Sequence, residues 1–146
     1  MTIGAYPLCT SGGGGMKWFS KEVPKEVWEE ATSSPLGDIE AAEKIRTICR
    51  SVADSAAAVA TRGGGGKKAA EKQFERDSER YQRAARAAME IAMKVSDELM
   101  RDAAVREIVE LCMKAGDLKT AKILFRAIQS PTIRDPVLRE FPVLQA

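Results

Sequence analysis

Two similar octets occur in the last third of the chain, one beginning at Arg101 and the other at Arg134. Each octet consists of Arg-Asp, three small or apolar residues, Arg-Glu and a large apolar residue. A fixed period of about 33 residues is typical of helical repeats. We therefore expect the stretch 101–140 to organise the fold, and we expect that fold to be made of helices.

An apolar stripe with helical spacing follows Gly116, and its residues recur every three or four positions, as on one face of a helix. Two similar stripes occur earlier in the chain, one of them directly after Gly37. The three sets are Leu118, Ala121, Leu124, Phe125 and Ile128; Ala88, Ile91, Ala92 and Val95; and Ala42, Ile45 and Cys49. The second helix of a hairpin is therefore expected up to three times, most clearly after Gly37 and Gly116.

The pair Gly116-Asp117 predicts a tight turn between two helices. Glycine takes the left-handed conformation freely, and an aspartate caps the free amide groups of the helix that follows. Gly37-Asp38 is expected to do the same before a helix at about residues 39–49. A helical hairpin of this kind does not bury its apolar face alone, so neighbouring hairpins should stack.

The unit around Gly116 resembles a tetratricopeptide repeat. The residues at that family's packing offsets are Val105, Ile108, Val109, Cys112, Ala121, Phe125 and Ile128. The resemblance covers residues 102–135, with weaker flanking copies, and departs at Val109, where the family has a small residue, and at Cys112, where it prefers an aromatic. The segment 112–125 also looks like a pentatricopeptide repeat. The resemblance implies an all-α fold of stacked antiparallel helical hairpins, and an ordinary helical bundle stays open as the alternative.

Two runs of four glycines divide the chain, and such runs are flexible because no side chain restricts their backbone. We expect four segments: a flexible leader at 1–15, an N-terminal helical hairpin at 16–62, a glycine linker at 63–66 and C-terminal helical hairpins at 67–146. Engineered linkers and natural loops look alike in a sequence, and we slightly favour an engineered origin for at least one of the two runs.

Several further helix boundaries follow from capping and proline signals. A first helix is expected to begin at Ser20, and helix is expected again over residues 51–60. A long helix should run from about Lys67 to Met93, with a solvated first half. The pair Asp135-Pro136 predicts a short final helix over residues 137–141, which would cap the repeats.

Composition argues against an enzyme. The 146 residues suit one domain or two small ones, and they include no histidine, the commonest general base and metal ligand. The three cysteines are scattered, so neither a disulfide framework nor a zinc site is predicted. We expect no catalytic residues, no cofactor and no metal.

The chain carries no targeting or membrane signal that we can identify. No apolar stretch approaches the roughly 18 residues of a membrane-spanning helix, and the N-terminal residues do not resemble a signal peptide. Scattered cysteines fit a reducing compartment, so a cytoplasmic location is expected.

The expected function is a non-enzymatic protein–protein interaction module: an adaptor, chaperone or assembly subunit that binds a helix or extended peptide of a partner, in a hetero- or homo-oligomer. The tetratricopeptide resemblance implies a groove-facing set of Arg106, Glu110, Met113 and Lys114, although a solvated helix face explains the same four residues. Two alternatives are an RNA-binding repeat of the pentatricopeptide type and a self-associating structural bundle. Interleaved charges and a net charge of only +2 disfavour nucleic acid.

Overall fold

The computed structural model describes residues 26–29, 36–61 and 68–145. The chain divides into two compact units, Met1–Glu30 and Ala31–Ala146. In the first unit the described element is the short 3-10 helix η3 (Val27–Glu29). The expected leader, both glycine runs and most of the first expected helix lie outside the described residues.

The second unit consists of helices throughout its described residues, which confirms the predicted all-α class. Its elements are α1 (Asp38–Ser51), α2 (Ala53–Ala60), α3 (Lys68–Ala92), α4 (Glu98–Lys114), α5 (Leu118–Ala127), α6 (Pro131–Glu140) and the 3-10 helix η4 (Pro142–Gln145). The helices predicted at about 39–49, 51–60 and 67–93 correspond to α1, α2 and α3.

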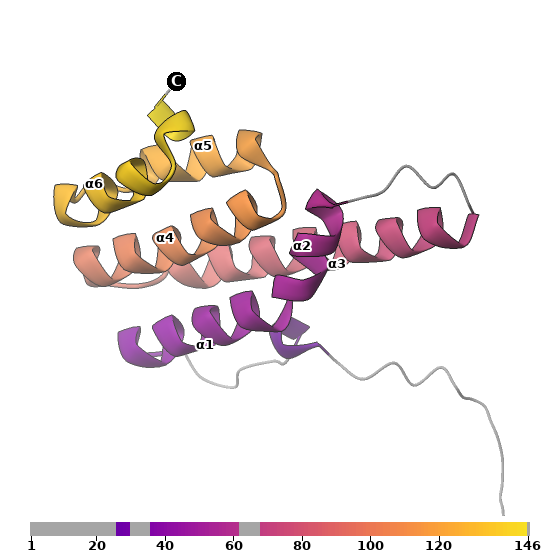
Figure 1. Ribbon diagram of the computed structural model, residues 1–146. Helices are drawn as coiled ribbons and strands as arrows, with labels where there is room; N and C mark the ends of the chain where they lie inside the picture. The colour runs from indigo at the N-terminus through magenta and orange to yellow at the C-terminus, as the bar shows by residue number, and fades with distance from the viewer. Residues whose placement is uncertain (1–25, 30–35, 62–67, 146) are drawn as a thin grey trace, which may run out of the picture. The chain divides into compact units, whose positions relative to one another are not determined.

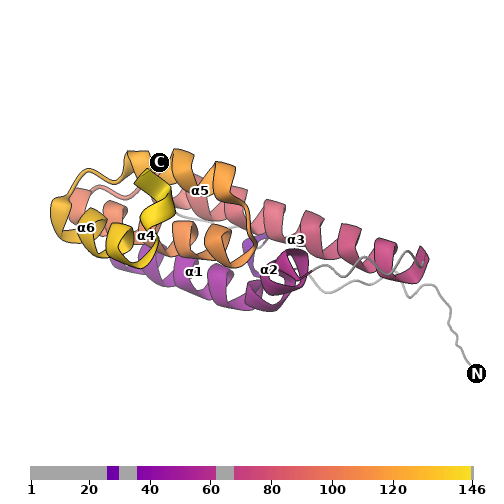
Figure 2. The same ribbon diagram turned by 45° about the horizontal axis from the view of Figure 1, so that its top comes forward.

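Helix α4 lies at the centre of this unit and packs against α1, α2, α3, α5 and α6. Figure 2 shows α1, α4 and α6 side by side, with α3 and α5 behind them. We call α1, α4 and α6 the first layer and α3 and α5 the second layer. Because α1 and α2 pack on α3 and α4, the parts of the chain before and after residues 62–67 share one core.

The core combines branched aliphatic side chains on the first layer with a row of alanines on α3. Ile45 and Ile48 of α1 and Ile108 of α4 are fully buried. Across from them, α3 is fully buried at three positions spaced by four residues: Ala84, Ala88 and Ala92. Because an alanine side chain ends at Cβ, this spacing lets the backbone of α3 lie close to its neighbours.

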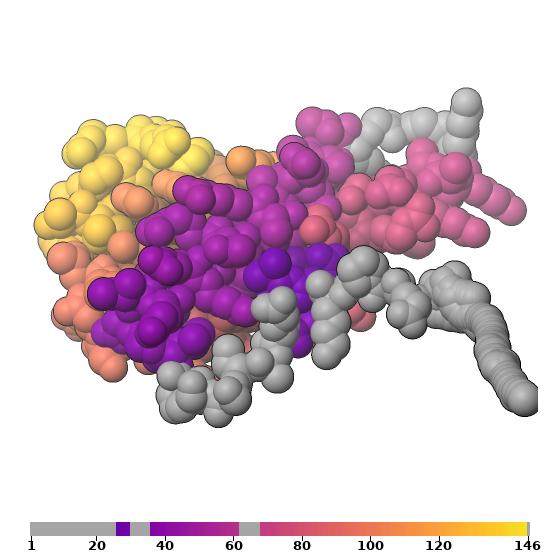
Figure 3. All heavy atoms as spheres, turned by 90° about the horizontal axis from the view of Figure 1, so that it is seen from below, coloured from indigo at the N-terminus to yellow at the C-terminus, as the bar shows by residue number. Residues whose placement is uncertain are grey.

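The first half of α3 is solvated, as its charge pattern predicted. Residues 68–73 are all exposed. In Figures 1 and 3 this end of α3 extends past α1 and α2. With little apolar surface to bury, the segment is held as helix by its good helix formers and by contacts along its own surface, including the hydrogen bond from Gln73 to the Asp77 carboxylate one turn away.

The turn between α4 and α5 has the predicted geometry. Gly116 adopts a φ of +74°, the left-handed conformation that ends α4. Asp117 then accepts a hydrogen bond from the Thr120 amide at 3.2 Å and caps α5. Figure 1 shows α4 and α5 as an antiparallel hairpin around this turn.

Replacing Gly116 with alanine should destabilise the protein by about 1 kcal/mol, because a residue with a Cβ is strained at positive φ. The added Cβ itself would meet only Ala60, at an ordinary contact distance of 3.7 Å, so the backbone conformation is the cause. Urea unfolding would measure the change. Gly37→Ala is the matched control: Gly37 has a φ of −69°, and its Cβ would displace only the end of the Glu40 side chain. An equal loss in both variants would contradict this explanation.

Gly37-Asp38 does not repeat the Gly116-Asp117 turn, so the predicted cap at Asp38 is wrong. Gly37 is the N-cap residue of α1, and its amide donates to the Glu40 carboxylate at 2.8 Å. The Asp38 carboxylate instead accepts from the backbone amides of Ser96 and Asp97, at 2.8 and 2.9 Å. Because Gly37 occupies the N-cap position, the Asp38 side chain is left to bind the two backbone amides of the neighbouring turn.

These two hydrogen bonds lower the pKa of Asp38 below its ordinary value of 3.8. The carboxylate therefore stabilises the fold fully above that value, and the contribution is lost as pH falls through the lower folded pKa. Asp38→Asn should lower the Tm at neutral pH, and the difference from wild type should shrink as the pH falls below 3.8, the ordinary pKa of this group. A difference that stays constant over this range would show that the charge is not involved.

Helix α6 begins earlier than predicted. Ser130 is its N-cap residue and Pro131 its first residue, whereas Asp135-Pro136 lies inside the helix. Proline is favourable at a first helical position because an N–H there has no partner within the helix, so its absence costs nothing. Pro131 occupies that position in α6, and Pro136 follows inside the helix. Helices α4 and α6 begin at Glu98 and Pro131, so each octet begins at the fourth residue of its helix.

A carboxylate from one helix of the first layer holds the turn that precedes the next. Asp38 of α1 binds the amides of residues 96 and 97, before α4. Asp102 of α4 binds the amides of Gln129 and Ser130, before α6, at 3.1 and 2.8 Å. The two pairs of amides have the same separation in the sequence as the two octets, so the period in the sequence coincides with a repeated contact in the fold.

Candidate functional site

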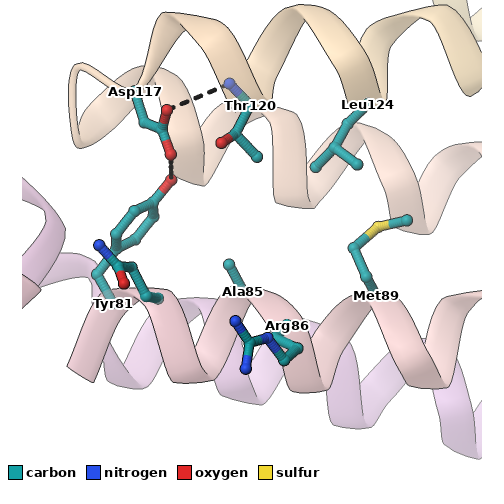
Figure 4. Close-up of a pocket in the computed structure, with 8 residues that line it drawn as sticks. Tyr81, Ala85, Arg86, Met89, Asp117, Thr120 and Leu124 are labelled. Atoms are coloured by element: carbon teal, nitrogen blue, oxygen red, sulfur yellow. Dashed lines mark hydrogen bonds between the residues drawn. The ribbon is translucent and has the colours of Figure 1, made fainter. Parts of the chain in front are cut away.

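A groove of about 520 Å³ lies between α3 and α5, in the second layer. Both helices contribute lining side chains, and the turn before α5 adds one. The lining residues are Tyr81, Gln82, Ala85, Arg86 and Met89 of α3, with Asp117, Thr120 and Leu124. Figure 4 shows that the groove changes in character along its length, from polar groups at Tyr81 to apolar groups at Met89.

The polar end is closed by a hydrogen bond between the two helices. The Tyr81 hydroxyl donates to the Asp117 carboxylate at 2.8 Å (Figure 4), and the Tyr81 side chain is only 3% exposed. Burial, together with the neighbouring Cys112 and Asp117, raises the pKa of the Tyr81 phenol well above its usual range. Tyr81 therefore stays protonated and serves as a structural tie between α3 and α5.

The apolar end is formed by Met89 and Leu124, which face each other across the groove in Figure 4. Both are half-buried, and Ala85, between them and Tyr81, is too small to fill the space. Met93 follows Met89 by one helical turn and is 64% exposed. Gln82, Arg86 and Met89 thus form a stripe on α3, spaced by four and three residues, and Met93 continues this spacing just past the end of the helix.

Arg86 is the cation in the lining of this groove. Its side chain is exposed, and within the described part of the chain it makes no salt bridge or hydrogen bond. Figure 4 shows it lying along α3 rather than across the groove. The carboxylate in the lining, Asp117, is already used by Tyr81 and by the Thr120 amide. The unneutralised charge of the lining is therefore positive.

The four residues predicted for partner binding lie elsewhere, on the solvent side of α4. Arg106, Glu110 and Met113 are half-buried and Lys114 is exposed, and none of them lines the groove between α3 and α5. Arg106 and Glu110 approach each other at 3.8 Å, and burial is the main cause that raises the pKa of Glu110. Their common face was predictable from helical spacing; whether it binds a partner stays a prediction.

The groove residues could not be assigned to one site from the sequence. The stripe on α3 is visible as a spacing, but Leu124 has the same spacing as the buried residues of α5. Only the packing of α3 and α5 on a common neighbour, α4, brings Met89 and Leu124 together.

The described residues offer little for covalent or metal chemistry. Burial raises the pKa of Cys49 to about 12 and that of Cys112 to about 11, so both thiols are held in the unreactive protonated form. Among the residues that the structure describes, no group of three or more potential metal ligands comes together. The groove therefore presents contact surface, a cation and hydrogen-bonding groups.

Fold and groove together define a class: an all-α protein of antiparallel helices around a central helix, with a mixed polar and apolar groove on one layer. None of the described helices combines the length and apolar character needed to cross a membrane. No protein-family model matches the chain, and comparisons with curated proteins and with solved structures find no similar protein.

Proposed function

We propose that this chain is a non-enzymatic interaction module of stacked helical hairpins, related in design to tetratricopeptide repeats, and that it binds a segment of another protein in the groove between α3 and α5. The observation that supports this most is the pairing of Met89 and Leu124. Two large apolar side chains lie side by side there without being fully buried, at one end of a groove that two helices line.

The framework suits recognition of a peptide. The groove is lined by two helices fixed on α4, so its side chains are held in place before a partner arrives. Grooves between helices commonly accept the apolar side of a helix or extended peptide, which places side chains into gaps such as the one above Ala85. The polar groups at Gln82 and Thr120 would then orient the bound segment.

The α4 face with Arg106, Glu110, Met113 and Lys114 is a second proposed contact surface. It belongs to the first layer, so a partner bound there would not occupy the groove between α3 and α5. The two surfaces make separate predictions, and variants that affect one should leave the other unchanged.

Selection from a library of displayed peptides with apolar residues at helical spacing tests the groove. Peptides enriched on the wild-type protein should lose affinity by about tenfold or more on Leu124→Arg, because a charge would stand in the apolar end. Met113→Arg, on the α4 face outside the groove lining, is the control and should bind normally.

The circular dichroism and Tm of each variant show whether it is folded. The proposal for the groove fails if no peptide is enriched, or if the enriched peptides bind Leu124→Arg as well as wild type. Peptides that are lost on Met113→Arg alone would move the binding site to the face of α4.

A further inference from the structure

The charges around the groove are unbalanced, although those of the whole chain are not. Residues 81–94 and 117–127, which include both groove walls, carry six basic and two acidic side chains, a net charge of +4. The whole chain carries only +2, so the remaining residues are net acidic. Basic side chains therefore outnumber acidic ones in the two segments that form the groove.

Neutralisation within the protein reduces this imbalance only in part. Arg83 is paired with Glu79 at 3.4 Å, outside the groove lining. Asp117, one of the two acids, accepts hydrogen bonds from Tyr81 and Thr120. Arg86 has no partner among the described residues and lies beside the apolar end, one helical turn before Met89.

We infer that the segment bound in the groove is an acidic amphipathic helix, which places apolar side chains against Met89 and Leu124 and a carboxylate on Arg86. This inference rests on the proposed function of the groove and names the chemistry of its partner. An arginine beside apolar surface favours a carboxylate because the guanidinium forms paired, charge-assisted hydrogen bonds with it.

The spacing of the groove residues fits a helix. Gln82 and Met89 of the groove lining are seven residues apart on α3, which corresponds to about 10 Å along a helix axis. A helix lying along the groove covers that length in about two turns. Apolar residues at its positions i and i+3 or i+4 would contact Met89 and Leu124, with an acidic residue near Arg86.

The same positive charge would also attract a nucleic acid, but the lining of the groove does not favour one. Single strands are bound by stacking their bases on exposed aromatic side chains. The aromatic residue in the lining is Tyr81, which is buried, and its hydroxyl is committed to Asp117. Met89 and Leu124, at the other end of the groove, are suited to aliphatic contacts with a helix.

A charge-balanced peptide library tests the inference. The library would fix leucine at positions i, i+3, i+4 and i+7 of a helical peptide of about 16 residues. The other positions would vary among Glu, Lys, Gln and Ala. It would be selected on the wild-type protein, on Arg86→Glu, on Leu124→Arg and on Arg83→Glu. The last variant is the matched control, because it makes the same charge reversal on the same helix outside the groove lining.

We expect the wild-type protein to enrich glutamate over lysine. The best acidic peptide should bind Arg86→Glu about tenfold more weakly and Arg83→Glu within about twofold of wild type. Raising the salt concentration should weaken its binding to wild type more than to Arg86→Glu, since exposed charges are screened.

Other outcomes separate this inference from the proposed function. Enriched peptides without excess glutamate, or with equal losses on Arg86→Glu and Arg83→Glu, would overturn the acidic partner while leaving the groove as the site. Absence of enrichment, or binding that Leu124→Arg does not reduce, would overturn both. Binding of a labelled single-stranded oligouridine more tightly than any peptide, with loss on Arg86→Glu, would replace the acidic helix with RNA.

Discussion

Replacing Asp102 with alanine should lower the free energy of unfolding by about 2–4 kcal/mol, because hydrogen bonds to a charged group contribute more than neutral ones and their loss leaves two amides without this partner. The Asp102 side chain is only 2% exposed and accepts from the amides of Gln129 and Ser130. Ser130 is the N-cap residue of α6, so the bond holds the start of that helix against α4. Urea unfolding followed by circular dichroism measures the effect.

Asp135→Ala is the matched control for this prediction. Asp135 is the residue of the second octet that corresponds to Asp102 in the first, but it is exposed on α6. Its replacement should change stability by less than about 0.5 kcal/mol, as for most surface substitutions. Asp102→Asn, which keeps one acceptor oxygen and loses the charge, should fall between the two. Equal effects of Asp102→Ala and Asp135→Ala would show that the contact with the 129–130 turn contributes nothing.

Replacing Ile108 with alanine should cost about 2–5 kcal/mol, the range observed when large buried aliphatic side chains are truncated. Ile108 is fully buried in α4, and α4 contacts every other α-helix of the second unit that the structure describes. A cavity at this position removes contacts from several helices together, so little local collapse is available to fill it.

Ile123→Ala provides the comparison, since it removes the same atoms from a side chain that is 54% exposed on α5. Its effect should stay below about 1 kcal/mol because most of that side chain already contacts water. Thermal and urea unfolding of both variants measure the difference. A cost for Ile108→Ala no larger than that for Ile123→Ala would contradict the central position of α4 in the core.

The local elements followed from the sequence where one residue type has a strong conformational preference. Gly116 and Asp117 fixed the turn between α4 and α5, since the left-handed backbone and the helix cap each depend on one residue. The cap of α4 is of the same local kind, since Asp97 accepts from the Met100 amide three residues further on. These features depend on residues that are near one another in the chain.

Local signals failed where a residue had a second partner far away in the sequence. Asp38 follows a glycine as Asp117 does, and this pattern predicts a helix cap. Its carboxylate instead binds the turn at residues 96–97. Asp135-Pro136 has the form of a helix start, but Ser130-Pro131 begins α6, and Asp102 holds that start from a distant part of the chain. In both places, the packing of the helices decided which backbone amides lay within hydrogen-bonding distance of a carboxylate, Asp38 in one and Asp102 in the other.

By itself, the sequence determined the helical class, the hairpin at Gly116 and the period of the two octets, because hydrophobic spacing and turn chemistry act over a few residues. The tertiary structure alone decided that α4 is central, that α3 and α5 lie side by side and that Met89, Leu124 and Arg86 share one groove. The reason is physical: a helix face is specified by its own residues, whereas a groove is specified by two helices and the neighbour on which both of them pack.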